Sequence, residues 1–293
     1  MKSQRSVQDP GGKLYLVGTP IGNLEDITFR AIRILKEAAV IAAEDTRNTK
    51  KLLNHFDIHT PLLSYHEHNL REGGDRILTV LAGGEDVALV SDAGMPCISD
   101  PGADIAARAI GEGYAVVPVP GANAALSALI ASGLPAQPFL FHGFPPRKKN
   151  DRRELFGKMA VRGETVIFYE SPHRLKESLR DLETAFGAER RVALVRELTK
   201  KFEEILRGTA REAVSYAESA DLKGEFCIIV EGADAESVQR AEEQSEWWNG
   251  LTQKAHVEAV MEREGVPPKD AIKIVAKERG EPKRDIYQAY HLA

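Results

Sequence analysis

The segment Ser91–Gly102, SDAGMPCISDPG, decides the fold that we predict for this chain. It follows the apolar run Asp86–Val90 and precedes a helical stretch at Ala103–Gly111. In α/β proteins, small ligands bind where strands end in loops before helices, because such loops expose backbone donors and carboxylates. The segment therefore predicts a site for a nucleotide-like or adenosyl-like molecule at the carboxyl end of a strand.

The same construction opens the chain, where Lys13–Val17 leads into Gly18–Leu24 and a helical stretch follows from about Asp26 to Ala38. Up to Pro118, short apolar runs alternate with amphipathic stretches. This alternation predicts a mostly parallel sheet with helices on both faces. The expected strands are Leu14–Val17, Val40–Ala43, Pro61–Ser64, Val87–Ser91 and Ala115–Val119.

A second α/β domain is expected after the proline- and glycine-rich stretch Pro118–Gly121. Residues Ala122–Gly133 predict a buried, alanine-rich helix closed by glycine. The run Lys201–Arg207, followed by Gly208, favours a hairpin, so this sheet is expected to be mixed. The expected strands are Phe139–His142, Thr165–Tyr169, Arg191–Val195, Phe202–Arg207 and Phe226–Glu231, with helices near Arg153–Ala160, Pro172–Ala185 and Ala210–Ala217.

The last part of the chain is expected to be helical. Residues Gly232–Glu246 are charged and poor in apolar side chains, which predicts a linker or a solvated helix. Beyond Trp247 and Trp248, a helix-turn-helix arrangement is expected. Its two helices are placed at Thr252–Glu264 and Lys269–Arg279, and a third helix is expected at Arg284–Ala289. The predicted fold class is thus α/β, with domains at 13–120 and 121–233 and a small helical module at 246–293.

The composition excludes several classes of protein. Of 293 residues, 43% are hydrophobic and 28% charged, as in an ordinary soluble enzyme and unlike a disordered chain. No apolar run reaches the ~18 residues that span a bilayer, and residues 1–12 lack a signal-peptide core, so a cytoplasmic protein without membrane contact is expected. Only Cys97 and Cys227 are present, which predicts reduced thiols and neither a disulfide framework nor a cysteine-built metal site.

The net charge and the local charge clusters limit the kinds of partner that this protein can bind. A formal net charge of −5 argues against indiscriminate nucleic-acid binding. Two local basic clusters, at Pro146–Arg153 and around Lys200–Lys201, nevertheless suit a phosphate backbone as well as they suit a solvated charged turn. Histidines at Tyr65–Asn69, and His55 with His59, lack the spacing of a metal site, so no metal is expected.

Each candidate site residue has a structural alternative. Asp92 either caps the next helix or faces a ligand, and Asp100 before Pro101 is expected to be a helix cap. Asp45 or Thr46 is expected to cap the following helix, with a substrate contact from Arg47 as the alternative. G-x-G-x-x-G and G-x-x-x-x-G-K-[ST] fingerprints are absent, which favours a nucleoside without a polyphosphate.

A third strand-to-helix loop contains Glu170, His173 and Arg174, which together offer an acid, a base and a phosphate clamp. The alternative is structural, because Ser171 before Pro172 is a suitable helix start. Both interpretations stay open at this stage.

Six motifs, in order along the chain, resemble those of the ribosomal RNA small subunit methyltransferase I family, a branch of the tetrapyrrole-methylase-like, class III S-adenosylmethionine-dependent methyltransferases. They are LYLVGTPIGNL (14–24), AEDTR (43–47), SDAGMPCISDPG (91–102), PGANAALSAL (120–129), YESPHR (169–174) and RELTK (196–200). The resemblance runs from about residue 14 to 231, and the helical tail is also similar to the C-terminal module of that family. Where the wider superfamily often has G-D-P, this chain has S-D-A-G, which favours the RNA branch.

The resemblance implies two α/β domains with a cofactor cleft between them, a homodimer, and S-adenosyl-L-methionine as cofactor. It implies methyl transfer to the 2′-hydroxyl of a cytidine in the decoding region of 16S ribosomal RNA, within the assembled small subunit. The alternatives are methylation of a tetrapyrrole carbon and a non-catalytic RNA-binding protein that senses S-adenosylmethionine.

The site residues expected from this resemblance and from the residue chemistry fall into three groups. Cofactor contacts are expected from Pro20, Ser91, Asp92, Ala93, Gly94, Ile98, Ala122, Asn123 and Tyr169. Catalytic candidates are Glu170, His173, Arg174, Glu197 and Lys200, with Arg196 as a further phosphate or hydroxyl contact. RNA contacts are expected from Arg47, Arg147, Lys148, Lys149, Arg152, Arg153 and, on one face of the tail's middle helix, Lys269, Lys273 and Lys277.

Overall fold

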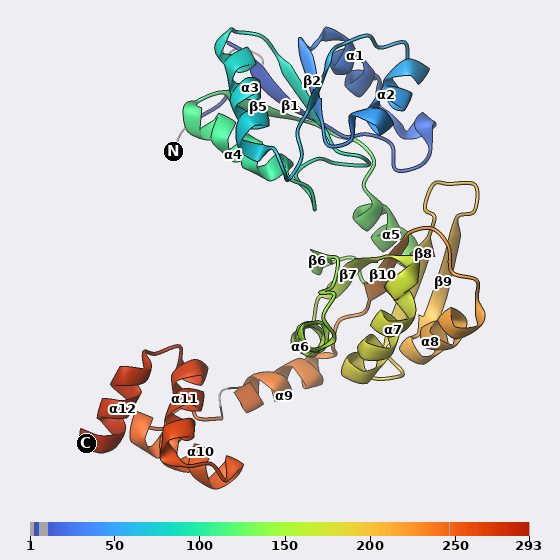
Figure 1. Ribbon diagram of the computed structural model, residues 1–293. Coiled ribbons are helices and arrows are strands. Elements are labelled where there is room, and N and C mark those ends of the chain that lie inside the picture. The colour runs from blue at the N-terminus through green and yellow to red at the C-terminus, as the bar shows by residue number, and fades with distance from the viewer. Residues whose placement is uncertain (1–2, 6–10, 246, 293) are drawn as a thin grey trace. The chain divides into compact units, whose positions relative to one another are not determined.

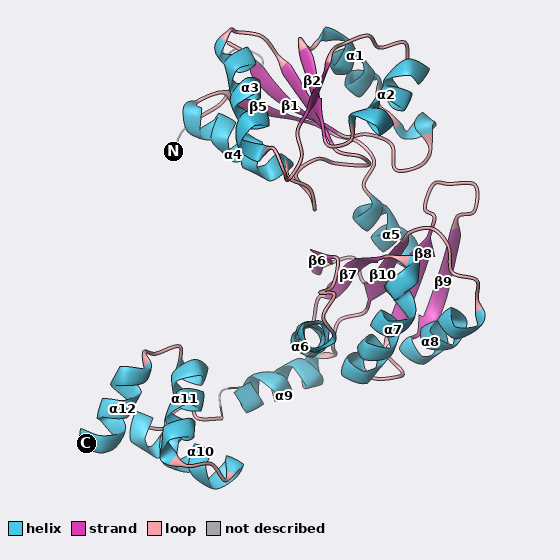
Figure 2. Ribbon diagram, in the orientation of Figure 1, coloured by secondary structure: helices cyan, strands magenta, loops and turns pink. Residues whose placement is uncertain are grey.

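The computed structural model describes residues 3–5, 11–245 and 247–292. The chain divides into two compact units, residues 1–233 and 234–293. The first unit contains two five-stranded sheets, and the second consists of helices (Figures 1 and 2).

The first sheet is parallel throughout, with strand order β3-β2-β4-β1-β5. Its strands are β1 (Lys13–Val17), β2 (Val40–Ala43), β3 (Leu62–Ser64), β4 (Val87–Val90) and β5 (Ala115–Val119). The connections contain η1 (Leu24–Asp26), α1 (Phe29–Glu37), α2 (Thr46–His55), α3 (Leu70–Ala82) and α4 (Gly102–Glu112).

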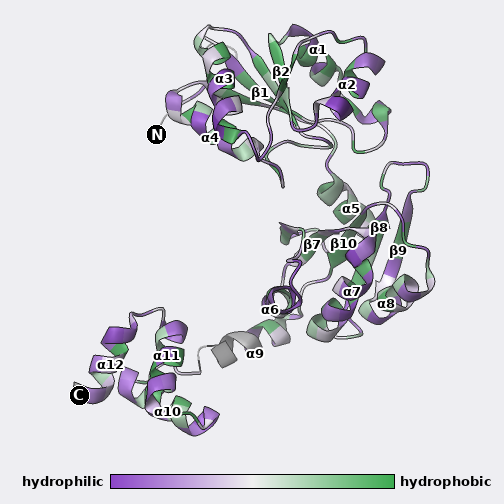
Figure 3. Ribbon diagram, viewed as in Figure 1, coloured by the Kyte–Doolittle hydropathy of each residue, from purple (hydrophilic) through white to green (hydrophobic). Residues whose placement is uncertain are grey.

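Both faces of this sheet are covered, and β4 shows why. Successive side chains of a strand point to opposite faces. Val87 and Leu89 therefore pack against α3 and α4, while Ala88 and Val90 pack against α1 and α2. A strand buried on both faces must be apolar at every position, and Figure 3 shows the central strands of both sheets as hydrophobic.

The second sheet is mixed, with strand order β6-β7-β10-β8-β9. Only β6 and β7 are parallel, and the remaining pairs are antiparallel. Its strands are β6 (Phe139–Gly143), β7 (Thr165–Glu170), β8 (Arg191–Arg196), β9 (Glu204–Thr209) and β10 (Phe226–Val230). One face packs on α6 (Lys149–Ala160), α7 (Pro172–Phe186) and α8 (Ala210–Ser219), and the other packs on α5 (Ala124–Ser132).

The second unit contains α9 (Ala235–Ser245), α10 (Gln253–Glu264), α11 (Pro268–Arg279) and α12 (Lys283–Leu292). Its small core is formed by Val257, Val260, Ala271, Ile272, Val275 and Ile286. Trp248 stacks on the ring of the buried His256, with 5.1 Å between ring centroids, and Trp247 packs on the same ring from its edge. The two tryptophans thus belong to the core of this module.

The expected mixed second sheet and helical tail are confirmed, with shifts at the element ends. The strand predicted at Phe202–Arg207 is β9, which begins two residues later because Lys200–Glu203 make the turn of the hairpin. The segment predicted as a linker or solvated helix contains α9. None of the described helices is long and apolar enough to cross a membrane.

Candidate active site

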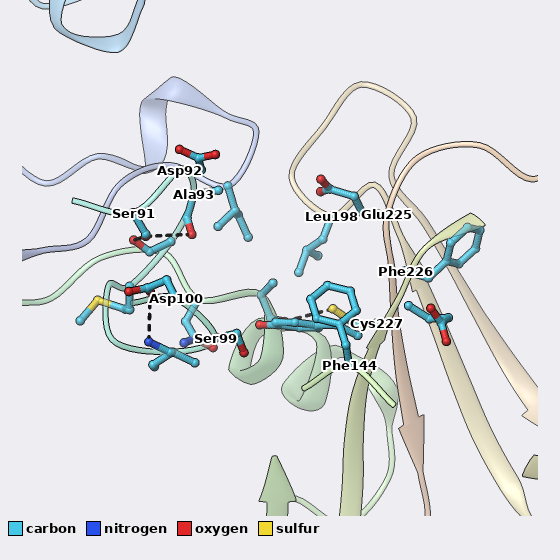
Figure 4. A pocket seen from close by; sticks show the side chains of 18 of the residues that line it. Ser91, Asp92, Ala93, Ser99, Asp100, Phe144, Leu198, Glu225, Phe226 and Cys227 are labelled. Carbon is cyan, nitrogen blue, oxygen red and sulfur yellow. Dashed lines mark hydrogen bonds between the residues drawn. The ribbon is translucent and has the colours of Figure 1, made fainter. Parts of the chain in front are cut away.

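A cavity of about 560 Å³ lies in the first unit, where loops from both sheets meet. The first sheet contributes the loops after β1, β2 and β4. The second contributes the ends of β6, β7 and β8, the start of α5 and the start of β10 (Figure 4). The amino end of β10 lies here because it is antiparallel to its neighbours, so that Phe226 pairs with Glu170 of β7 and Arg196 of β8.

The loop after β4 is held in shape by Asp100. Its carboxylate accepts hydrogen bonds from the backbone N–H groups of Gly102 at 2.7 Å, Cys97 at 3.0 Å and Ile98 at 3.2 Å. Cys97 and Ser99 have φ angles of 71° and 68°, a left-handed conformation that costs free energy for residues other than glycine. Asp100 therefore stabilises a strained loop and accepts from the first N–H of α4, although the N-cap position that was predicted for it is held by Pro101.

Two glycines bring the loops after β1 and β5 into backbone contact. A Cβ atom at Gly121 would lie 2.8 Å from the Cα of Gly18, and a Cβ at Gly18 would lie 2.8 Å from the Cα of Gly121 and the Sδ of Met95. Thr19 also exchanges backbone hydrogen bonds with Gly94, at 2.9 and 3.1 Å. These contacts join the loops that follow β1, β4 and β5 into one continuous wall of the cavity.

Gly121→Ala is expected to lower the free energy of unfolding by about 2 kcal/mol, because a methyl group there overlaps backbone rather than a movable side chain. Urea denaturation measures the change. Gly111→Ala on α4 is the matched control, since nothing lies within 4 Å of its added Cβ and alanine favours helix. Equal stability of the Gly121 variant and the native protein would contradict the close approach.

The charged side chains that line the cavity are all acidic: Glu44, Asp92, Asp100, Glu170 and Glu225. Burial raises the pKa of Glu44, and the charges of Asp92 and Asp100 raise it further. A cavity with this lining favours a ligand that carries positive charge, because such a ligand relieves the repulsion among the carboxylates.

Asp92 does not cap α4. Its Oδ1 accepts from the backbone N–H of Asp45 at 3.1 Å, which ties the loop after β4 to the start of α2. Asp45 is the cap of α2, as predicted, and accepts from the backbone N–H of Arg47. Asp92 and Ser91 also line a second cavity of about 260 Å³, together with Pro20 and residues of α2. Asp92 therefore lies on the wall that the two cavities share.

Most of the expected cofactor contacts are brought together. Seven line the larger cavity: Ser91, Asp92, Ala93, Gly94, Ile98, Asn123 and Tyr169. Asn123 caps α5 through its side-chain oxygen, and the hydroxyl of Tyr169 accepts from the N–H of Ala125 at 3.1 Å. Burial raises the pKa of Tyr169 to about 12, so its hydroxyl keeps a proton that it can donate.

The other two expected cofactor residues lie close by. Pro20 lines the smaller cavity, and the carbonyl oxygen of Ala122 lies 3.4 Å from the position of a Cβ on Gly94. Cys97, in the loop after β4, and Cys227, which lines the larger cavity, are free thiols. Burial raises the pKa of Cys97 to about 11 and that of Cys227 to about 12, so neither is a thiolate at neutral pH.

Glu170, the last residue of β7, lines the cavity, and its carboxylate is hydrogen-bonded to residues at the start and in the middle of the following helix, α7. It accepts from the backbone N–H of Ser171 at 2.8 Å and from the hydroxyl of Ser178 at 2.5 Å, and it is 1% exposed. The guanidinium of Arg174 donates to the carbonyl oxygens of Pro145 and Pro146. His173 is exposed and does not line the cavity. The structure therefore assigns Glu170 and Arg174 structural roles and leaves His173 outside the site.

Glu197 and Lys200 form an ion pair beside the cavity, with 2.9 Å between Oε1 and Nζ. Lys200 also pairs with Glu225 at 3.0 Å, and a Cβ at Gly22 would overlap its side chain. Burial opposes ionisation of Glu197, but the hydrogen bond from Lys200 lowers its pKa. A carboxylate with a lowered pKa is a weaker proton acceptor. The contact of Lys200 with Gly22 connects the two halves of the unit, and a catalytic role for Glu197 and Lys200 stays a prediction.

The expected RNA contacts divide by exposure. Arg47, Arg147, Lys148, Lys149, Arg153, Lys269, Lys273 and Lys277 are exposed. Arg152 is 1% exposed and donates twice to Asp181, at 2.6 and 2.9 Å. Its expected contact with RNA is corrected, because a buried and paired guanidinium cannot reach a phosphate.

Sequence reasoning missed Glu44, Phe144 and Glu225. Glu44 follows β2 at the same edge where Ser91 follows β4, as the pairing of Ala43 with Val90 shows, so the strand-end rule could have identified it. Glu225 precedes a strand, and only the antiparallel pairing of β10 brings it to the cavity. Phe144 had no signal in the sequence beyond its place after a strand.

Comparisons with known proteins agree with this architecture. Residues 13–214 match the family profile described as tetrapyrrole (corrin/porphyrin) methylases. A solved cobalt precorrin-4 methyltransferase superposes with a TM-score of 0.58 at 19% identity, covering 75% of this chain and 94% of that one. A uroporphyrin-III-C-methyltransferase from Thermus thermophilus gives 0.54 at 22%, covering 79% and 98%. The fold and the site thus define a methyltransferase of the tetrapyrrole-methylase class.

Relatives found by sequence similarity identify a narrower family. A ribosomal RNA small subunit methyltransferase I from Halalkalibacterium halodurans is 57% identical over 99% of both chains. One from Bacillus subtilis is 52% identical over 96% of this chain and 94% of that protein. The chain belongs to the ribosomal RNA small subunit methyltransferase I family, as the six motifs predicted.

Proposed function

We propose that this chain transfers the methyl group of S-adenosylmethionine to the 2′-hydroxyl of a cytidine ribose in the decoding region of 16S ribosomal RNA. The names of its relatives support the small ribosomal subunit as the target. The single observation that carries the proposal is the lining of the cavity, in which every charged side chain is a carboxylate.

The residues present fit this cofactor. A sulfonium and an ammonium group are cations that carboxylates attract, and ribose hydroxyls donate to carboxylate oxygens. A volume of about 560 Å³ lies within the usual range of ligand pockets. Asp92, Asn123 and the donor hydroxyl of Tyr169 would hold the cofactor, and Gly94, with a φ of 79°, lets the loop turn at the cavity wall. When bound, S-adenosylmethionine supplies a methyl carbon attached to a sulfonium leaving group.

The protein must then orient an RNA hydroxyl and accept its proton. The new bond joins the ribose oxygen to the methyl carbon, the bond from sulfur to that carbon breaks, and the proton goes to a base. Orientation contributes most, up to ~7–11 kcal/mol of the barrier, and a positioned base contributes ~10²–10⁴-fold. Glu44 suits the role of base: it lines the cavity, its pKa is raised, and its carboxylate has no hydrogen-bond partner among the described residues.

Glu44→Gln is expected to lower kcat by about 10²-fold, because an amide cannot accept the proton. The native kcat/KM should rise with pH through a pKa above the usual glutamate range, since the base acts when ionised and both burial and the charge of Asp92 raise this pKa. The variant should lose this rise. Methyl incorporation measured across pH checks both results.

Glu112→Gln, an exposed carboxylate at the end of α4, is the matched control and should keep the native profile. An unchanged kcat in the Glu44 variant, with an unchanged pH profile, would assign the proton to another acceptor.

The RNA would be held by exposed cations. Arg147 and Lys148 lie between β6 and α6, Lys149 begins α6, and Lys269, Lys273 and Lys277 lie on α11 of the second unit. Cations of this kind contribute most of the affinity for a phosphate backbone. A homodimer, a cytoplasmic location and the assembled small subunit as substrate belong to the same proposal.

The proposal is tested by incubating the protein with tritiated S-adenosylmethionine and either small ribosomal subunits or a tetrapyrrole precursor. We expect label in the subunits alone, and nuclease digestion with mass spectrometry should recover 2′-O-methylcytidine. Label in the tetrapyrrole would overturn the substrate, label on a base would overturn the chemistry, and label in neither would overturn enzymatic function.

A further inference from the structure

An exposed aromatic ring stands at the cavity. Phe144 lines it, yet 56% of the residue is exposed. The centroid of its ring lies 5.7 Å from that of Tyr169, in an edge-to-face arrangement. Figure 4 shows Phe144 among the residues that line the cavity. Ile98 lines the same cavity and is 42% exposed, and exposed apolar side chains that gather at a ligand cavity mark a binding surface.

The loop that carries Phe144 is held rigidly. Arg174 donates to the carbonyl oxygens of Pro145 and Pro146, at 2.7 and 3.1 Å, and Arg152 donates to that of Arg147 at 3.4 Å. Two consecutive prolines restrict the backbone further. The backbone that positions the ring is therefore preorganised, and the contact with Tyr169 restrains one side of the ring, which lowers the entropic cost of binding a planar partner.

The loop that carries Phe144 begins next to Ser99, which lies in the half of the unit formed by the first sheet. Gly143 has a φ of 79°, and a Cβ there would lie 3.2 Å from the hydroxyl of Ser99. Phe144 consequently follows the point where the halves of the first unit approach each other. Arg147, Lys148 and Lys149 follow within five residues, and all three are exposed.

We propose that Phe144 stacks on the base of an RNA nucleotide whose ribose enters the cavity. This inference rests on the proposed function and adds to it the residue that holds the target base. A nucleotide that presents its 2′-hydroxyl in a cavity must leave its stack, and its base then exposes both faces to water. A rigid aromatic ring beside a run of cations is the combination by which proteins hold single-stranded nucleic acid.

The adenine of the cofactor is the competing partner for this ring. The charges favour RNA, because the cations of the same loop suit phosphates, whereas the carboxylates of the cavity suit the cationic cofactor. Most of the Phe144 surface is also open to solvent rather than enclosed by the cavity wall.

The test compares Phe144→Ala with Phe144→Tyr, which keeps a stacking ring. Phe29→Ala is the matched control, since Phe29 is 93% exposed and lines neither cavity. Calorimetry gives the affinity for S-adenosylmethionine. Anisotropy gives the affinity for a labelled, cytidine-containing single strand, and methyl incorporation gives KM for small subunits. Thermal unfolding confirms that each variant is folded.

For Phe144→Ala we expect roughly 10- to 100-fold weaker RNA binding and a correspondingly higher KM, the range that stacking of one base contributes. Affinity for S-adenosylmethionine should stay within about 2-fold, and Phe144→Tyr and Phe29→Ala should behave as the native protein. If Phe144→Ala weakened binding of S-adenosylmethionine and left RNA binding unchanged, the ring would contact adenine, and the proposal would be overturned. Unchanged affinities for both S-adenosylmethionine and RNA would overturn it as well. The binding arm needs no turnover, so it separates a failure of this inference from a failure of the proposed reaction.

Discussion

Asp181→Ala should be the most destabilising single change, lowering the free energy of unfolding by about 3–5 kcal/mol. The side chain of Arg152 is 2% exposed, and its guanidinium would remain buried without its partner. Arg153 would lose the same carboxylate, from which its Nε lies 2.7 Å. Urea denaturation at neutral pH measures the loss.

Glu177→Ala is the matched control, because Glu177 reaches the same guanidinium at 3.6 Å but is 73% exposed. An exposed ion pair contributes about 0–1 kcal/mol, so this variant should stay near the native stability. A similar loss in both variants would contradict the assignment of a buried pair at Asp181.

The pair also predicts a dependence on pH. Burial opposes ionisation of Asp181, but hydrogen bonds from Arg153 and Arg152 lower its pKa below the usual aspartate value. A lowered carboxyl pKa adds stability that is complete above the unfolded pKa and is lost as pH falls through the folded one. The difference between native protein and Asp181→Ala should therefore shrink in acid.

Asp100→Ala should abolish tight cofactor binding, with a Kd at least about 100-fold higher. The carboxylate accepts three backbone N–H groups, and because Asp100 is only half-buried, each bond contributes about 1 kcal/mol, less than the roughly 1.5–3 kcal/mol of a buried bond to a charged group. Without them, the left-handed conformations of Cys97 and Ser99 lose their support. Calorimetry with S-adenosylmethionine measures the affinity, and urea denaturation should show a loss of about 3 kcal/mol.

Asp100→Asn retains one acceptor oxygen and should fall between the native protein and the alanine variant. If the alanine variant lost stability but bound the cofactor normally, the loop after β4 would be a scaffold only, and the cofactor would contact other loops.

The pattern of apolar residues was sufficient to predict the layers of the fold. Strands buried on both faces, such as β4, read as continuous apolar runs, and capping residues such as Asp45 mark helix starts. The strand-end rule also located the loop at Ser91–Gly102, because parallel strands with covered faces leave only their ends for ligands. Local chemistry and periodicity carry this information without knowledge of distant contacts.

The roles of individual side chains were harder to predict from the sequence. Glu170, Arg152 and Arg174 look like catalytic or RNA-binding residues in the sequence, yet their partners Ser178, Asp181 and Pro145 lie 8 to 29 residues away along the chain. A charge meets solvent, ligand or a buried partner according to where the chain folds back, and the sequence pattern does not contain that information.

The sequence by itself determined the two sheets, their helices and the loop that forms a wall of the site, because periodicity, glycine placement and helix capping act over a few residues. The tertiary structure alone decided which carboxylates line the cavity and which arginines are buried. It also placed Glu225 and Phe144 at the site. Each of these results depends on contacts between segments far apart in the chain. Strand pairing brings Glu225 to the cavity, and the packing of α6 against α7 buries Arg152 beside Asp181, so register and helix packing set the neighbours of a side chain.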